Sequence, residues 1–140
     1  MSETGNTTTS QMSQQALAAR FLTRTRAELE QMRACLPDAT LPIEPLATAH
    51  LERMAHKIAK AADAFGFPEI SVIAGGIELL SQASLARTVR ERIELSSRLT
   101  AQLSALEVHL EFELAEREAR DVPEELASAA HQAARDSRRK

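Results

Sequence analysis

Residues 51–77 read LERMAHKIAKAADAFGFPEISVIAGGI, two apolar stripes of helical period separated by one sharp break. The first stripe consists of Leu51, Met54, Ile58, Ala61 and Phe65. Gly66 is a typical C-terminal stop of a helix, and Pro68 suits the first turn of the next one. The second stripe consists of Ile70, Ile73, Ile77 and Leu80. Gly75 and Gly76 interrupt it at a cost of about 1–2 kcal/mol in helix propensity, which predicts close helix packing there.

Stripes of the same period flank this stretch on both sides. Upstream, residues 14–36 carry a stripe of Leu22, Thr25, Leu29, Met32 and Leu36. Three prolines within residues 37–45 then mark a connector, because proline ends one helix and suits the start of another. Downstream, a longer stripe begins near Leu85 and continues to about Leu114. Its apolar members are Val89, Ile93, Leu99, Leu103, Leu106 and Leu110.

The composition fits one all-α domain. The chain has 140 residues, 44% hydrophobic and 26% charged, which allows a packed core of ordinary size. We therefore expect an antiparallel four-helix bundle over residues 14–118, with each stripe facing a shared core. Residues 1–13 are polar and are expected to form a disordered tail. Residues 119–140 break at Pro123 and are expected to be a C-terminal extension with room for a short helix.

Charge and composition exclude several classes of function. The net charge of −3 and the absence of Tyr and Trp argue against nucleic-acid binding, which uses a positive field and stacking aromatics. Cys35 is the only cysteine, so no internal disulfide can form, and a reducing compartment fits. No apolar run approaches the roughly 18 residues of a membrane span, and the polar N-terminus does not resemble a secretory signal. We expect a cytoplasmic protein that binds neither nucleic acid nor a membrane.

One histidine lies off the predicted core. At about 100° per residue, His56 falls about 180° from the centre of its stripe and should point into solvent. Its neighbours on that outer face are cations and small residues: Arg53, Lys60, Asp63, Ala49 and Ala59, with Lys57 on the flank. Small side chains leave room for another protein, and nearby cations could stabilise a phosphoryl group on the ring. An ordinary surface histidine has the same placement, so the angular argument leaves both interpretations open.

The stretch around this histidine carries a more specific pattern. Residues 55–71 read AHKIAKAADAFGFPEIS, with an aliphatic residue two positions after His56 and small residues five and six positions after it. A Phe-Gly-Phe turn and the start of the next helix follow. This pattern resembles the signature of histidine-containing phosphotransfer (HPt) domains of bacterial two-component phosphorelays. With the helices on either side, the resemblance spans about residues 14–115.

The resemblance implies an HPt bundle in which His56 is the phosphorylated residue. Its Nε2 would accept a phosphoryl group from an aspartyl phosphate on a response-regulator receiver domain and return it. The receiver would bring Mg²⁺ and an acidic pocket, so the chain needs no cofactor of its own, and a hybrid histidine kinase is a further partner. Candidate supporting cations are Arg53, Lys57 and Lys60. The small docking surface would consist of Ala49 and Ala59.

Two positions depart from the family pattern. The family commonly has Lys three positions after the histidine and Gly four positions after it, where this chain has Ala59 and Lys60. Lys60 could crowd the receiver or supply the missing cation, and its flexible, hydrated stem favours the second interpretation. The alternative function is a non-phosphorylated helical module that binds or sequesters a receiver or kinase.

The rest of the chain offers little further chemistry. It has no Gly-rich phosphate loop, nucleophile elbow or kinase signature, so we expect a phosphoryl carrier and not an enzyme. His50, His109 and His131 are expected to be surface or boundary residues. Glu52 lies one turn before His56, but the repeated Glu-x-x-His sets of di-iron bundles are missing, so no metal site is predicted. A monomer is expected, with dimerisation through the long fourth helix as an alternative that predicts a concentration-dependent mass.

Overall fold

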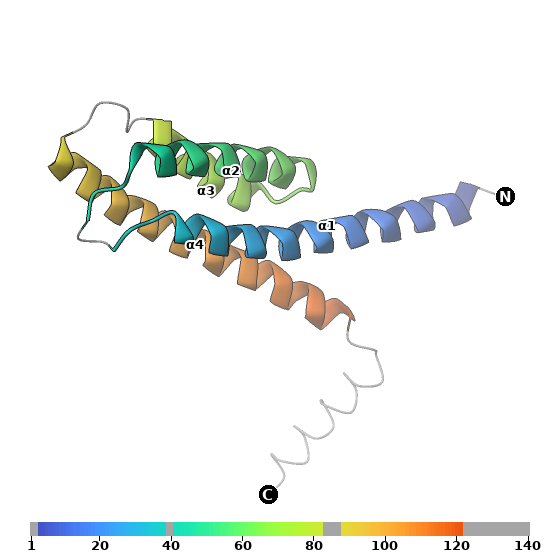
Figure 1. Cartoon of the computed structure of the whole chain (residues 1–140). Coiled ribbons are helices and arrows are strands. Elements are labelled where there is room, and N and C mark those ends of the chain that lie inside the picture. Colours follow the sequence, from blue (N-terminus) through green and yellow to red (C-terminus); the bar gives the residue numbers. More distant parts are fainter. Residues whose placement is uncertain (1–2, 39–40, 83–87, 122–140) are drawn as a thin grey trace, which may run out of the picture.

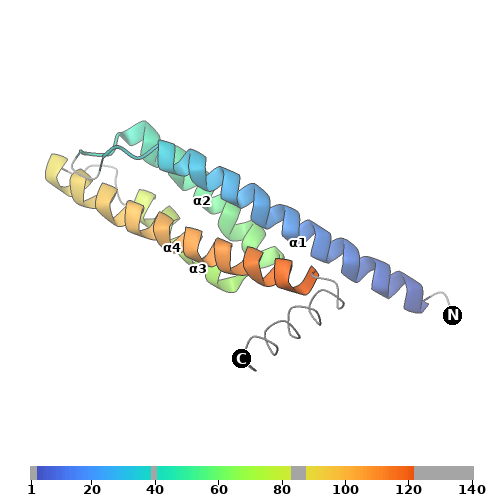
Figure 2. The same cartoon turned by 90° about the horizontal axis from the view of Figure 1, so that it is seen from below.

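A computed structural model describes residues 3–38, 41–82 and 88–121, and these residues form a bundle of four α-helices (Figure 1). The helices are α1 (Glu3–Ala34), α2 (Pro45–Ala64), α3 (Pro68–Gln82) and α4 (Val89–Asp121). Successive helices run in opposite directions, and α1 and α4 extend well beyond the shorter pair α2 and α3 (Figures 1 and 2). The predicted all-α four-helix bundle is confirmed.

The turn between α2 and α3 forms where the sequence predicts it. Gly66 has a φ of +82°, a conformation that costs glycine little because it has no Cβ. The Phe67 amide donates to the Ala62 carbonyl at 2.8 Å and the Gly66 amide to that of Asp63 at 3.3 Å, the paired bonds of a Schellman motif. Pro68 then begins α3. This motif folds α3 back along α2 without a connecting loop.

The core contains the apolar stripes of all four helices. Its largest fully buried side chains include Leu22, Leu29, Met32, Leu51, Ile58, Ile70, Ile77, Leu99, Leu103 and Leu106. In α2, however, Ala55 and Ala62 are buried, whereas Phe65 of the predicted stripe is 37% exposed. The buried face of α2 is therefore rotated by about 60° toward α3 relative to the prediction. The rotation arises because α2 packs most extensively against α3.

The helix boundaries differ from the prediction at the two ends of the bundle. Helix α1 begins at Glu3, so it includes residues 3–13, which the sequence assigns to a polar tail. That part of α1 projects past the other helices (Figure 1). It lacks the apolar stripe that predicts a helix over residues 14–36. Helix α4 ends at Asp121, beyond residue 118, where the bundle is predicted to end. The predicted start near Leu85 and the extension over residues 122–140 lie outside the described residues.

The predicted close packing at Gly75 and Gly76 is wrong. A Cβ added to Gly75 would meet nothing within 4 Å, and one on Gly76 would meet only the side chain of Gln102, at 3.9 Å. The glycines lie off the face that α3 buries, which consists of Ile70, Ala74, Ile77 and Ser81. The internal packing of the bundle therefore does not require either glycine.

The burial pattern predicts how substitutions affect stability. Replacing the fully buried Leu106 by Ala should lower the free energy of unfolding by about 2–5 kcal/mol, because it removes buried methyl groups and leaves a cavity. Leu79→Ala is the matched control, since Leu79 is 67% exposed and should change stability by less than about 0.5 kcal/mol. Urea unfolding followed by circular dichroism measures both values. Equal losses in the two variants would contradict this assignment of the core.

Candidate functional site

His56 lies on the outer side of α2, as predicted. Its side chain is 48% exposed. Because the buried face of α2 is rotated toward α3, the ring lies about 120° from the centre of that face instead of the expected 180°. The imidazole is thus open to solvent on one side and close to α3 on the other.

The ring has a partner that the sequence analysis did not identify. His56 Nδ1 lies 2.8 Å from Oε1 of Glu78, whose side chain is 21% exposed on α3. A second bond fixes the two helices beside this pair, since the Ser71 hydroxyl donates to the carbonyl of Ala59 at 2.9 Å. No spacing rule within one helix could have found Glu78, because it is 22 positions away on a different helix. The feature of the sequence that points to Glu78 is that it is one of only two charged residues in α3.

This contact fixes the chemical character of the imidazole. A carboxylate can only accept a hydrogen bond, so a neutral ring holds its proton on Nδ1 when it bonds to Glu78. The Nε2 lone pair is then free to act as a nucleophile. When Nε2 forms a bond and the ring becomes positively charged, the Glu78 carboxylate stabilises that charge, as the buried carboxylate does in a catalytic triad.

The three predicted cations lie on the outer surface of α2. Arg53, Lys57 and Lys60 are all exposed, and within the described parts of the chain none of them forms an ion pair. Their charges are available to a group that approaches the helix. The two alanines of the predicted docking surface differ in position, because Ala49 is exposed whereas Ala59 is half-buried toward α3.

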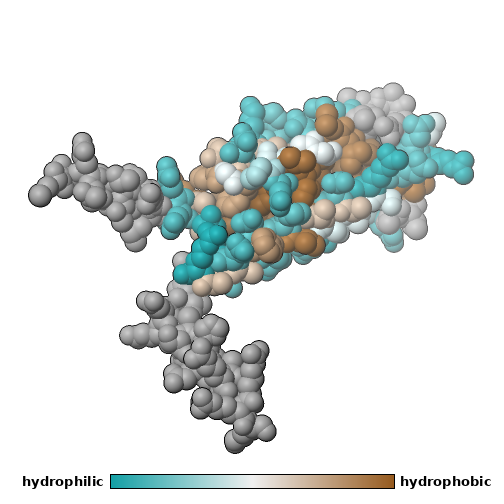
Figure 3. Space-filling model, turned by 180° about the vertical axis from the view of Figure 1, so that it is seen from behind, coloured by the Kyte–Doolittle hydropathy of each residue, from teal (hydrophilic) through white to brown (hydrophobic). Residues whose placement is uncertain are grey.

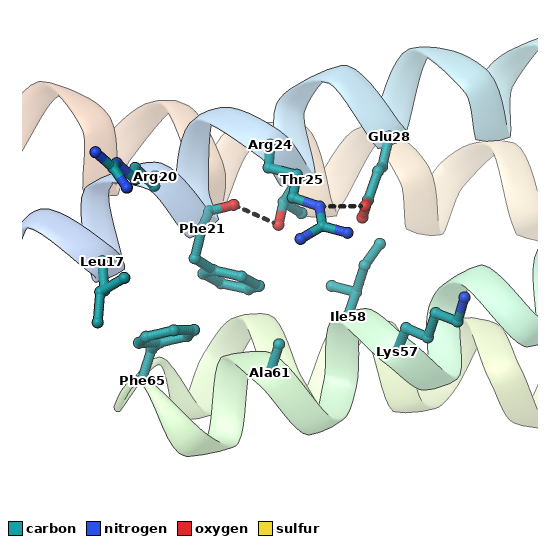
Figure 4. A pocket seen from close by; sticks show the side chains of 10 residues that line it. All are labelled: Leu17, Arg20, Phe21, Arg24, Thr25, Glu28, Lys57, Ile58, Ala61 and Phe65. Atoms are coloured by element: carbon teal, nitrogen blue, oxygen red, sulfur yellow. Dashed lines mark hydrogen bonds and ion pairs between the residues drawn. The ribbon is translucent and has the colours of Figure 1, made fainter. Parts of the chain in front are cut away.

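A groove runs between α1 and α2, beside the cationic surface. Its volume is about 330 Å³. The rings of Phe21 and Phe65 stack across it with their centroids 5.3 Å apart (Figure 4). Its other apolar lining residues are Leu17, Ile58 and Ala61. Arg20, Arg24, Glu28 and Lys57 line the groove as well. Arg24 pairs with Glu28 at 3.2 Å, so Arg20 and Lys57 supply the net positive charge at the edge of this apolar cleft.

The other described histidines have different surroundings. His50 is exposed, and His109 on α4 is 36% exposed, so both lie at the surface or its boundary as predicted. His109 Nδ1 lies 3.2 Å from Glu69 Oε2, a pairing similar to that of His56. However, the hollow next to His109 is lined by Glu69 and Glu113 and by no Lys or Arg. An anionic group would therefore be repelled there. His131 lies outside the described residues.

Cys35 does not have the properties of a reactive thiol. It is half-buried just after α1, and its Sγ donates a hydrogen bond to the Gln31 carbonyl at 3.4 Å. Burial raises the pKa of the Cys35 thiol, which favours the protonated, unreactive form. Cys35 therefore acts as a small side chain packed against the core.

Comparisons with known proteins do not indicate a function, so the geometry of the candidate site is the main evidence for one. No family model, no curated protein and no solved structure matches this chain. Within residues 3–38, 41–82 and 88–121, no helix is long and apolar enough to cross a membrane. In the same residues, no group of three or more His, Cys, Asp or Glu side chains is placed to hold a metal ion.

The contact between His56 and Glu78 predicts the ring tautomer. We expect the wild-type His56 ring to be protonated at Nδ1 when neutral, and Glu78→Ala to shift it toward protonation at Nε2, because the acceptor is gone. Long-range ¹H–¹⁵N correlation spectra of the imidazoles measure this directly. Glu69→Ala is the matched control, since it removes the carboxylate next to His109 and should change only that ring. An unchanged His56 tautomer in Glu78→Ala would refute the orienting role.

Proposed function

We propose that this protein is a histidine phosphotransfer protein that carries a phosphoryl group on His56. The observation that supports this most directly is the exposed imidazole whose Nδ1 lies 2.8 Å from Glu78, which leaves the Nε2 lone pair of the neutral ring available. The resemblance of residues 55–71 to the HPt signature supplies the class of partner, a response-regulator receiver domain. A hybrid histidine kinase is a further expected partner.

The transfer uses groups of the two proteins together with the Mg²⁺ that the receiver would bring. The Nε2 lone pair of His56 attacks the phosphorus of the receiver's aspartyl phosphate, a P–N bond forms, and the P–O bond to the aspartate breaks. The electron pair of that bond leaves with the aspartate carboxylate. The ring keeps its Nδ1 proton and becomes positively charged, and Glu78 stabilises it through the existing hydrogen bond. The reverse sequence returns the phosphoryl group to a receiver.

The cations of α2 complement the charge that is transferred. Phosphoryl transfer depends mainly on positioning and on neutralising the oxygens of the moving group. Lys60 lies one turn after His56, a spacing that places the two Cβ atoms about 5–6 Å apart on a helix. Its four-carbon stem allows the ammonium to reach a phosphoryl group on Nε2. Arg53 and Lys57 add positive charge on the same outer surface.

The groove between α1 and α2 is suited to docking. It offers apolar surface at Phe21 and Phe65 and positive charge, unpaired within the described residues, at Arg20 and Lys57, so it complements an acidic partner surface with projecting apolar side chains. Its position favours α1 over α3 as the neighbour that completes the docking surface of α2. The partner then covers this groove and the outer face of α2 in one interface.

Phosphoryl labelling tests the proposal. The full chain, incubated with a panel of phosphorylated receiver domains, should acquire an acid-labile and alkali-stable phosphate. His56→Gln should acquire none, because the amide cannot form the P–N bond. His109→Gln is the matched control and should label as the wild type does, since it removes the other histidine that pairs with a carboxylate.

The same experiment distinguishes the second candidate. Receiver binding without labelling of the wild type would overturn the carrier function and favour a sequestering module. Labelling that persists in His56→Gln would also overturn the proposal, because the phosphate would then be carried elsewhere.

The role of Lys60 gives a separate prediction. If its charge stabilises the phosphoryl group, Lys60→Gly should slow transfer from the receiver several-fold, and Lys60→Arg should retain most of the rate. Lys60→Ala controls for the lower helix propensity of glycine, which costs about 1 kcal/mol. Single-turnover transfer kinetics measure these rates. A several-fold faster transfer in Lys60→Gly would contradict the cation role and show that the side chain obstructs the receiver.

A further inference from the structure

The outward side of α4 carries a row of apolar and small side chains, all of them exposed except one alanine that is half-buried. Val108 and Phe112 in its middle are 66% and 57% exposed. The complete row is Ala101, Ala105, Val108, Phe112, Ala115 and Ala119. It lies about 180° around α4 from the leucines that fill the core. Seen from behind, hydrophobic groups lie exposed toward the end of α4 that leads to the grey C-terminal residues (Figure 3).

The spacing of this row is that of a coiled coil. Its members are alternately four and three positions apart, which is the a and d pattern of a heptad repeat. The row is also symmetric in side-chain size about position 110, with two large residues in the centre and two alanines on each side. A dimer with a two-fold axis requires a surface that complements itself. A row that reads the same in both directions meets this requirement when two copies pack antiparallel.

We propose that α4 packs antiparallel against α4 of a second copy of this chain. The symmetry of the row sets the register. Val108 of one copy lies opposite Phe112 of the other, Ala105 opposite Ala115, and Ala101 opposite Ala119. Each layer then pairs an a position with a d position, which is the layer geometry of antiparallel coiled coils. The shallow hollow beside Phe112 and Ala115 receives the side chains opposite them.

The charges along α4 are compatible with this packing. Three of the glutamates near the row are already neutralised within the chain: Glu107 pairs with Arg33, Glu111 with Arg26 at 2.9 Å, and Glu116 with Arg120 at 3.4 Å. In the proposed register Glu111 approaches its own copy near the two-fold axis, and its Arg26 partner offsets the repulsion. On the flanks, Glu116 and Glu118 approach Gln102 and Ser104, which can donate hydrogen bonds.

The size of the surface indicates a reversible dimer. The row is about 27 Å long at 1.5 Å per residue, and a single pair of helices over this length buries less than the roughly 1,200 Å² of a standard interface. The dimer also leaves the candidate site open. In the described residues the backbones of α2 and α4 do not approach one another closely, and His56 lies on the outer side of α2, so both copies of His56 stay exposed. The inference is thus independent of the proposed function.

Sedimentation equilibrium of the full chain over about 1–500 μM tests the association. The average mass should rise with concentration from 15.4 kDa toward twice that value. Phe112→Lys should raise the dimer Kd at least about tenfold, because it places a charge in the central layer. Leu79→Lys is the matched control, since Leu79 is 67% exposed on α3, outside the row, and should leave the Kd unchanged. A constant monomer mass, or equal loss in both variants, would overturn the proposal.

Cysteine cross-linking tests the register. In a Cys35→Ser background, chains carrying Ala105→Cys mixed with chains carrying Ala115→Cys should form a disulfide-linked heterodimer under mild oxidation. Ala105→Cys alone should not cross-link, because the two copies of position 105 are about 15 Å apart along the helix axis in this register. Circular dichroism confirms that each variant is folded. Efficient cross-linking of Ala105→Cys alone would indicate a parallel arrangement and refute the antiparallel register.

Discussion

The tight turn at Gly66 is the constraint on which the candidate site depends. Its left-handed φ of +82° folds α3 directly back along α2, without a loop that would allow the two helices to slide. Residues at equal distances before and after the turn then lie side by side. His56 and Glu78 are each about 15–18 Å from it along their helices, which explains why residues 22 positions apart make a 2.8 Å contact. The Ser71 to Ala59 bond fixes the same register closer to the turn. The chemistry of the imidazole is thus set by backbone geometry as much as by the residues around it.

The surroundings of the two histidines that pair with glutamate show why the pairing alone does not make a phosphoryl site. Glu78 and Glu69 are the charged residues of α3, and each contacts one histidine, His56 on α2 and His109 on α4. In both cases the ring can hold its proton on Nδ1. The difference lies in the neighbouring charge, since exposed lysines lie near His56 whereas a further carboxylate, that of Glu113, lines the hollow at His109. A phosphoryl group carries close to two negative charges at neutral pH, so the electrostatic environment favours the ring on α2.

Much of the bundle follows from local sequence, and the site only in part. The stripes, the prolines and Gly66 encode helices and turns directly, because each acts through the conformation of its own residues. The exposure of His56 was predictable for the same reason. The contact with Glu78 was not, because it depends on how far α2 rotates when it packs against α3, and no pattern within one helix contains that angle. Residues 3–13, with which α1 begins, have no apolar stripe. Apolar periodicity identifies the part of a helix that buries one face. It cannot identify a part that projects beyond the core, because no face is buried there.

The two outer faces of the bundle have different physical properties, and this separates their roles. The outer face of α2 is charged, with small residues and the exposed His56, which suits the brief encounter that the proposed transfer needs. The outer face of α4 is apolar, and Val108 and Phe112 remain exposed there at a cost of about 25 cal/mol for each Å² of apolar surface in water. That cost is recovered only when the face is covered, and the symmetry of the row makes a second copy the surface that fits it. Because α2 and α4 are not neighbouring helices in the bundle, association through one outer face need not change the geometry of the other. Two copies joined in this way would therefore carry out the proposed transfer independently.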